Sequence, residues 1–227
     1  MQARPKADAP SARTRVRRHP ERGHYERELI DAILDEGLLA HLGIVDEGRP
    51  LVVPTMYARD GDRIYLHGSR AARWVKLLAS GAEACLSVTL IDGLVLARSA
   101  FKHSMNYRSV VIFGTATALE DRAEQLRAVA VLVDHVVPGR SRQARLPNEH
   151  ELEATALFSL SIAESSAKVR SGGPLDFEDD FERAVWAGVL PARVAFGAPL
   201  PDPLVSPTVP PAAELLAYAR ARSQVRR

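Results

Sequence analysis

Short apolar segments separated by turn signals follow one another through most of this chain, and they constrain its fold more than any other feature. The connection Asp60-Gly61-Asp62, between two of these segments, is a strong hairpin signal. Many antiparallel strands with a few inserted helices predict a mainly β fold (α+β), arranged as a closed or nearly closed barrel. The expected strands are residues 38–45, 51–58, 63–68, 84–90, 94–97, 109–119, 155–162 with an extension through 169, and 187–195.

Helical patterns interrupt the strands at three places. Residues 25–37 carry apolar side chains on one face and end in a glycine. A short helix follows residue 70, with Trp74, Leu77 and Leu78 expected to face inward. An acidic N-terminal signal predicts a third helix over residues 121–135.

The composition divides the chain into three parts. Residues 1–22 are polar and arginine-rich, which predicts a flexible basic arm. Residues 23–197 form the expected barrel domain. Residues 198–227 begin with a proline-rich run that cannot hold a ladder, so we expect an extended arm and a helical tail.

Composition also excludes several classes of protein. The net charge is only +2, and the single Cys85 excludes an internal disulfide and a cysteine-rich zinc site. No apolar segment approaches the roughly 18 to 20 residues that span a bilayer, and no secretory signal is recognisable. We therefore expect a cytoplasmic protein with no membrane contact.

The segment IYLHGSRAAR (residues 64–73) has the order strand, turn, helix that can hold a phosphate. Gly68 would let the backbone approach an anion, Ser69 offers a hydroxyl and an N–H, and a helix start presents free amides. Arg70 and Arg73, in the first turns of that helix, add permanently charged forks of donors matched to phosphate oxygens. Because this arrangement is common, its weight depends on the residues around it.

Other segments could form further walls of such a site. Arg108 and Ser109 lie where polar donors precede a long apolar strand, a pattern that equally fits a capped, solvated strand start. Pro54 interrupts an otherwise central strand, as expected for a bulge, an edge or a strand against a planar ligand. His41, His67 and His103 match no standard metal-ligand spacing, so no metal site is predicted.

The segments LVVPTMYARDGDRIYLHGSRAAR, DGLVLARSAFKHSMNYRSVVIFGTA, SAKVR and VWAGVLPARVAFGAPLPDP together resemble a known family. The chain is similar to the pyridoxamine 5'-phosphate oxidase-like, FMN-binding split-barrel superfamily, and within it to the flavin-nucleotide-binding branch that includes nitroimidazole-resistance proteins. The resemblance implies an antiparallel six-stranded split β-barrel. It also implies a homodimer that binds FMN at the subunit interface.

The resemblance also implies a set of site residues. His67 would lie in the active pocket, where it could relay a proton, and Lys168 and Arg170 are placed at the polar edge of the flavin ring by extrapolation. The expected cofactor-binding residues are Pro54, Thr55, Met56, Tyr57, His67, Gly68, Ser69, Arg73, Arg108, Ser109, Val110, Lys168, Arg170 and Trp186.

The function expected from this resemblance is that of a flavin-dependent oxidoreductase, in which the flavin passes electrons or hydride to a small organic acceptor. NAD(P)H is the candidate reductant. The C-terminal end, VWAGVLPARVAFG, lacks the basic and aromatic signature of the oxidase proper. We therefore do not expect true pyridoxamine-phosphate oxidase activity.

Three alternatives stay open at this point. The cofactor could be FAD or deazaflavin instead of FMN. It could also be haem, with His67 or His103 as an axial ligand. A third, less favoured reading is a non-catalytic nucleic-acid-binding or regulatory protein that uses the basic N-terminal arm.

Overall fold

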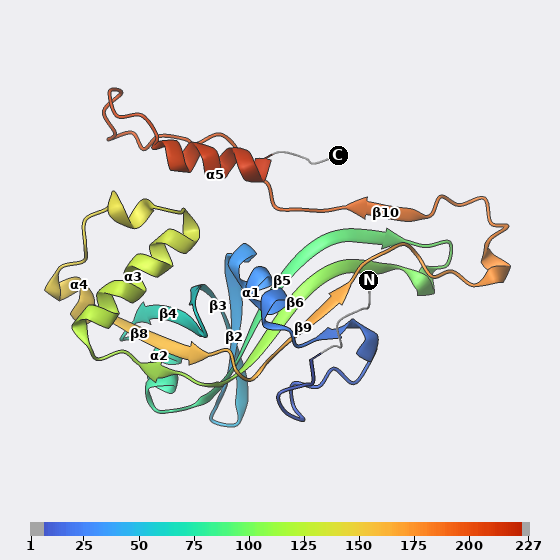
Figure 1. The fold of residues 1–227 in the computed structure, drawn as a ribbon, viewed down its shortest axis with the longest axis horizontal. Helices are drawn as coiled ribbons and strands as arrows, with labels where there is room; N and C mark the ends of the chain where they lie inside the picture. Colours follow the sequence, from blue (N-terminus) through green and yellow to red (C-terminus); the bar gives the residue numbers. More distant parts are fainter. Residues whose placement is uncertain (1–6, 224–227) are drawn as a thin grey trace.

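A computed structural model describes residues 7–223, in which a single antiparallel sheet curls around the core (Figure 1). The sheet order is β1-β9-β6-β5-β2-β3-β4-β8-β7, and β10 pairs with β5. This architecture confirms the predicted split-barrel fold.

The strands are β1 (Gly23–His24), β2 (Leu39–Asp46), β3 (Arg49–Asp60), β4 (Arg63–Ser69), β5 (Glu83–Leu96), β6 (Ser104–Thr115), β7 (Thr117–Ala118), β8 (Thr155–Ser161), β9 (Ser165–Arg170) and β10 (Gly188–Pro191). The helices are α1 (Arg27–Glu36), α2 (Arg73–Ala79), α3 (Arg122–Val136), α4 (Glu149–Ala154) and α5 (Ala213–Ser223), with short 3-10 turns at Pro20–Arg22, Ala100–Lys102, Arg140–Arg142 and Glu178–Asp180.

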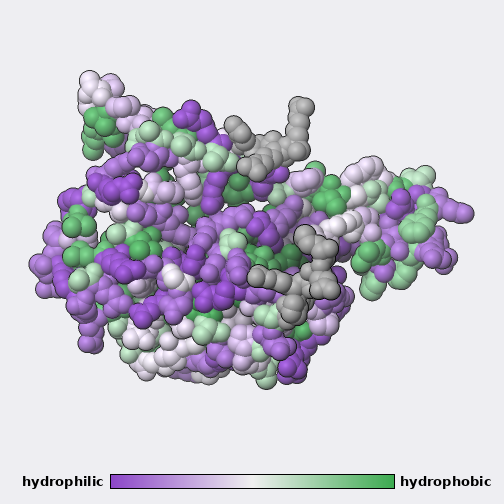
Figure 2. All heavy atoms as spheres, in the orientation of Figure 1, coloured by the Kyte–Doolittle hydropathy of each residue, from purple (hydrophilic) through white to green (hydrophobic). Residues whose placement is uncertain are grey.

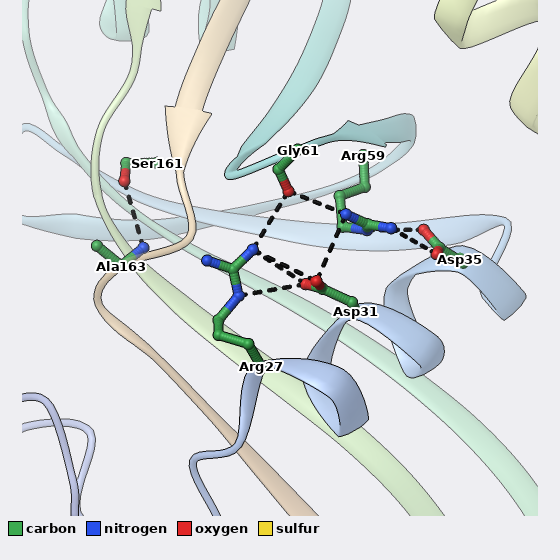
Figure 3. Close-up of polar contacts among 7 residues, drawn as sticks. All are labelled: Arg27, Asp31, Asp35, Arg59, Gly61, Ser161 and Ala163. Atoms are coloured by element: carbon green, nitrogen blue, oxygen red, sulfur yellow. Dashed lines mark hydrogen bonds and ion pairs between the residues drawn. The ribbon is translucent and has the colours of Figure 1, made fainter. Parts of the chain in front are cut away.

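The barrel closes between β8 and β9. The sequence predicts one strand that extends through residue 169, but the structure has two, because Ala163 N–H donates to the Ser161 hydroxyl (3.2 Å) and turns the chain (Figure 3). The short connection carries the chain from a strand paired with β4 to a strand paired with β6. Conversely, the two segments expected at 84–90 and 94–97 form one strand, β5, with a bulge between Ile91 and Gly93.

Helix α1 fills the open end of the barrel with its apolar face. Ile30, Ile33 and Leu34 are almost fully buried, and the Tyr57 hydroxyl donates to the Leu34 carbonyl oxygen (2.6 Å). In α2, Val75 and Leu78 are buried in the core, and Trp74 and Leu77, which were predicted to face inward, are half-buried and pack against it. A smaller core cluster lies between α3 and the outer side of β3, β4 and β8.

Salt bridges attach the outer face of α1 to the β3–β4 hairpin (Figure 3). Arg59 donates to the Asp35 carboxylate (2.7 and 2.6 Å) and lies 3.6 Å from Asp31. Arg27 and Arg59 both donate to the Gly61 carbonyl oxygen, at 3.2 and 2.9 Å. Gly61 has the positive φ of 60° that the predicted hairpin turn requires.

Residues 7–22 belong to the segment expected to be a flexible arm, yet in the structure they lie against the sheet. Thr14 is 2% exposed, and the Ser11 hydroxyl donates to Glu164 (2.7 Å). Arg13 donates to Glu164 (3.0 Å) and also pairs with Glu83. These carboxylates lie far away in the sequence, so local composition gives no sign of them. The rest of the predicted arm, residues 1–6, lies outside the described residues.

The chain after β9 extends away from the barrel, returns as β10 against β5, and ends in α5 (Figure 1). Helix α5 has no buried residue, and its contacts include a bond from Arg222 to the Glu36 carbonyl oxygen (3.1 Å). Among residues 7–223, no helix is long and apolar enough to cross a membrane.

Candidate functional site

The split between β3 and β4 is the centre of the candidate site. These strands pair only from Tyr57↔Leu66 to Asp60↔Arg63. On the N-terminal side of Tyr57, the residues of β3 pair with β2 instead. Strand β4 pairs with β8 from Arg63 to Ser69. Residues 54–56 and 67–69, both predicted to bind the cofactor, therefore lie on opposite sides of one split. The inner edge of β3 has no strand partner there among the described residues, so its backbone is available to a ligand.

The strand alternation decides which predicted residues can present a side chain. Thr55 and Tyr57 point into the barrel, and burial raises the pKa of Tyr57 well above its ordinary value. Pro54 and Met56 point outward. The residues of this strand therefore offer a ligand either backbone groups or the Pro54 and Met56 side chains.

His67 is the titratable side chain at this split. The ring is half-buried, and its Nδ1 is buried without a hydrogen-bond partner among residues 7–223. Burial lowers the pKa of the imidazole, which keeps it neutral near pH 7. A buried nitrogen without a hydrogen-bond partner destabilises the fold unless a ligand supplies the missing hydrogen bond. His67 thus fits the predicted position beside a cofactor.

The predicted phosphate turn uses its residues differently from the sequence expectation. Helix α2 has only seven residues and no side-chain cap, so its contribution to anion binding is weak. Arg73 forms an ion pair with the buried Asp46, which already balances its charge. The Ser69 hydroxyl accepts from Ala71 N–H (3.3 Å) and is exposed. Arg70, exposed and with no side-chain hydrogen bond or ion pair in the described chain, is the available cation.

Gly68 makes room for a side chain of the protein itself. A Cβ at this position would lie 2.4 Å from Trp74 Cζ2 and 2.8 Å from Val75 Cγ2. We expect Gly68→Ala to lower the free energy of unfolding by about 1–3 kcal/mol, the usual cost of overpacking. Urea denaturation measures this loss. In the background of Trp74→Ala the same substitution should cost much less, and an equal cost in both backgrounds would rule out the steric explanation.

The second group of predicted residues lies on β6 and consists of Arg108, Ser109 and Val110. Most of their side-chain contacts are with other residues of the protein. Arg108 donates to Asp92 (3.0 and 2.7 Å) and to Glu36 (2.5 and 2.9 Å), and these carboxylates raise its pKa. Val110 is fully buried in the core. Ser109 faces outward, and its hydroxyl donates to the Lys168 carbonyl oxygen (3.3 Å). In the described chain Arg108 is therefore paired with two carboxylates, and its assignment to the phosphate stays a prediction.

The last three predicted residues have three different environments. Arg170 is 7% exposed, and its guanidinium donates to Asn106 Oδ1 and to the carbonyl oxygens of Gly172 (3.3 Å) and Gly173 (3.2 Å). Burial lowers its pKa. Lys168 lies beside Ser109 in the β6–β9 ladder, with no side-chain partner in the described residues. Trp186 is 67% exposed and lies beside Gly188, before β10.

One chain does not bring all the predicted residues together. The ladders place Val110, Val88, Ala40 and Thr55 in one row across β6, β5, β2 and β3. Three strand spacings separate Val110 from Thr55, which is about 14 Å. The β3–β4 split and the β6–β9 group are therefore two separate clusters on one sheet.

His103 presents a second possible cofactor ligand, directly before β6 in the connection from β5. The exposed ring has Nδ1 3.0 Å from the Ser99 carbonyl oxygen. In the tautomer that donates this bond, Nε2 is left as a free acceptor, the usual orientation of a metal-bound histidine. Exposed apolar residues gather around this connection (Figure 2), where Phe101 and Phe177 stack at 6.4 Å. Within residues 7–223, no group of three His, Cys, Asp or Glu could hold a metal ion.

Known proteins with similar sequences and structures share this fold. The sequence model of pyridoxamine 5'-phosphate oxidase matches residues 26–169. The flavocytochrome Anf3 from Azotobacter vinelandii is 44% identical, with a TM-score of 0.87, over 93% of this chain and 98% of that one. A protein from Mycobacterium smegmatis that binds FAD and haem is 36% identical, with a TM-score of 0.82, over 89% and 97%.

A putative 5-nitroimidazole antibiotic resistance protein from Bacteroides thetaiotaomicron shares the fold at 21% identity, with a TM-score of 0.55, over 65% of this chain and 86% of that one. Among curated proteins, the search found no match. The family match spans more than half of the chain, and the two more similar structures cover nearly all of it. The chain therefore belongs to the pyridoxamine 5'-phosphate oxidase-like family of flavin-binding split-barrel proteins.

Proposed function

We propose that this protein is a homodimeric flavin-dependent oxidoreductase that also carries haem, and that passes electrons or hydride to a small organic acceptor. The observation that carries the proposal is the split between β3 and β4, with its free backbone edge and the unpartnered Nδ1 of His67. The relatives support both cofactors, since one is a flavocytochrome and another binds FAD and haem.

The chain's own residues would bind and orient the flavin. Backbone groups of residues 54–56 would hydrogen-bond its ring, and Ser69 and Arg70 would bind its phosphate. His67, neutral near pH 7, would form a hydrogen bond from its buried Nδ1 to the flavin ring. It could also move a proton to or from that ring. The bound flavin supplies the electron or hydride transfer. FMN and FAD share these contacts.

A second copy of the chain would cover the outer face of the sheet. On β2 and β3 this face carries Leu39, Val45 and Val52, which are 52%, 64% and 62% exposed, together with His41 and Pro54. None of these residues is a lysine, arginine or carboxylate, whereas a solvated sheet face normally carries such charges. Dimerisation would bury this face, and it would let one copy's β6–β9 cluster approach the other copy's split.

The acceptor is a small molecule other than pyridoxamine phosphate, because the chain lacks the basic and aromatic C-terminal signature of that oxidase. NAD(P)H is the proposed reductant. A nucleic-acid role for the N-terminal arm finds less support, since Arg13 is already paired with Glu83 and Glu164.

Spectroscopy of the purified protein tests this proposal. We expect flavin bands together with a Soret band, release of FMN or FAD detectable by mass spectrometry, and bleaching of the flavin by NADH or NADPH. Sedimentation should give the mass of two chains. A colourless protein that gains no flavin signal on titration with FMN or FAD would contradict the flavin assignment. A deazaflavin would instead be recognised by the mass of the released cofactor.

A further inference from the structure

Three arginines near the N-terminus have no counter-charge. Arg15, Arg17 and Arg18 are exposed, and none of them has a side-chain hydrogen bond, ion pair or ring contact with another residue of the described chain. The neighbouring Arg13, by contrast, pairs with Glu164 (3.0 Å), which balances its charge. Positive charge without a partner on a short stretch of chain favours the binding of an anionic molecule.

The segment that carries these arginines is held against the sheet. Thr14 is 2% exposed, and the Val16 N–H donates to the Tyr25 hydroxyl (2.9 Å). The Val16 side chain also covers Gly23, where a Cβ would lie 2.9 Å from Val16 Cβ. Because the backbone is already fixed, a partner that binds the arginines does not have to order the segment first.

The segment runs along the outer side of β6 and β9 (Figure 1). Gly23, which Val16 covers, pairs with Lys168 of β9. The Cζ atom of Arg13 lies 5.1 Å from the ring centroid of Phe113, on β6. In the proposed dimer this part of the sheet approaches the other copy's split. The three arginines would then lie at the rim of the covered face, near the place where the flavin is expected.

The chemistry of this surface favours an acidic protein over nucleic acid. The guanidinium fork matches a carboxylate in a bidentate geometry. Asp8 and Glu21 bound the positive stretch on either side, so it does not form the extended basic track that a nucleic-acid backbone follows. Residues 7–22 also contain no Phe, Tyr or Trp on which a base could stack.

We infer that an acidic electron-carrier protein docks on Arg15, Arg17 and Arg18 and delivers electrons to the flavin. The inference rests on the proposed function, since docking has this consequence only where a flavin lies at the split. Electron carriers form small, transient interfaces in which exposed charges steer the encounter, and three unpaired arginines suit such an interface. Two one-electron carriers are oxidised for each flavin that is reduced by two electrons, and the accompanying protons come from solvent.

Calorimetric titration of the flavin-loaded, full-length protein with oxidised flavodoxin, a small acidic electron carrier, tests the docking. We expect the affinity to fall about tenfold or more between low salt and about 0.3 M salt, because salt screens exposed charges. The double variant Arg15→Glu/Arg17→Glu should lose about tenfold or more of the affinity at low salt. In stopped-flow absorbance, reduced flavodoxin should transfer electrons to this variant about tenfold more slowly than to the wild type, whereas dithionite should reduce both at the same rate.

Arg49→Glu/Arg142→Glu is the matched control, because both arginines are exposed, unpaired within residues 7–223 and outside this segment. It should bind flavodoxin as the wild type does. Equal losses in the two double variants, no binding by the wild type, or tighter salt-sensitive binding of a DNA duplex than of flavodoxin would each overturn the inference. Loss of the dimer or of the flavin in Arg15→Glu/Arg17→Glu would do the same, since the arginines would then serve the second copy. A wild type that holds no flavin would instead contradict the proposed function.

Discussion

His103→Ala is expected to abolish the Soret band of the purified protein, whereas His67→Ala should leave that band in place. The two rings differ in how their second nitrogen is held. Nδ1 of His103 bonds to the Ser99 carbonyl oxygen, which would aim Nε2 at an iron, and exposed aromatic residues adjoin it. No such bond orients His67, whose buried Nδ1 instead needs a partner from the flavin. Absorption spectra of both variants, with haem quantified against protein, measure the difference.

Two controls separate ligand loss from misfolding. Flavin content should stay at the wild-type level in His103→Ala, and added imidazole should restore its Soret band by replacing the missing ligand. If haem survived in His103→Ala but was lost in His67→Ala, the iron ligand would be at the β3–β4 split, and the assignment of the two rings would be reversed.

The sequence was sufficient for the fold because its signals are local. The hairpin at residues 60–62 needs only a glycine that adopts positive φ, and α3 begins where the Asp121 side chain accepts from Glu124 N–H, three residues on. The break between β8 and β9 was missed although Glu164, Ser165 and Ser166 interrupt the apolar pattern there. What turns the chain there is one serine hydroxyl, which has no distinctive pattern.

The site was less predictable because residue type does not reveal a partner that is distant in sequence. Arg73 and Arg108 were expected to bind phosphate, yet Asp46, Asp92 and Glu36 already pair with them. The motif correctly identified a strand–turn–helix, but not that Trp74 occupies the space beside Gly68. A cavity of about 370 Å³ beside Arg70 could not be found from the sequence, since it is assembled from α2, β8 and the start of α3.

Arg170→Met is expected to lower the free energy of unfolding by about 2–3 kcal/mol, because it removes charge-assisted bonds from a buried site and leaves acceptors without a donor. Arg170 holds Asn106 and the carbonyl oxygens of Gly172 and Gly173, where the chain leaves β9. Urea denaturation measures the loss. Lys168→Met is the matched control, with an expected change within about 0.5 kcal/mol, since its ammonium has no partner in the described residues.

Flavin affinity then distinguishes a structural role of Arg170 from a role at the flavin ring. A buried guanidinium that is already bonded to three groups has little capacity left for a ligand, so folded Arg170→Met should bind flavin as tightly as the wild type. If instead Arg170→Met kept its stability and lost flavin affinity, the sequence-based assignment of Arg170 to the ring edge would be correct. Its bonds to residues 106, 172 and 173 would then be of minor importance.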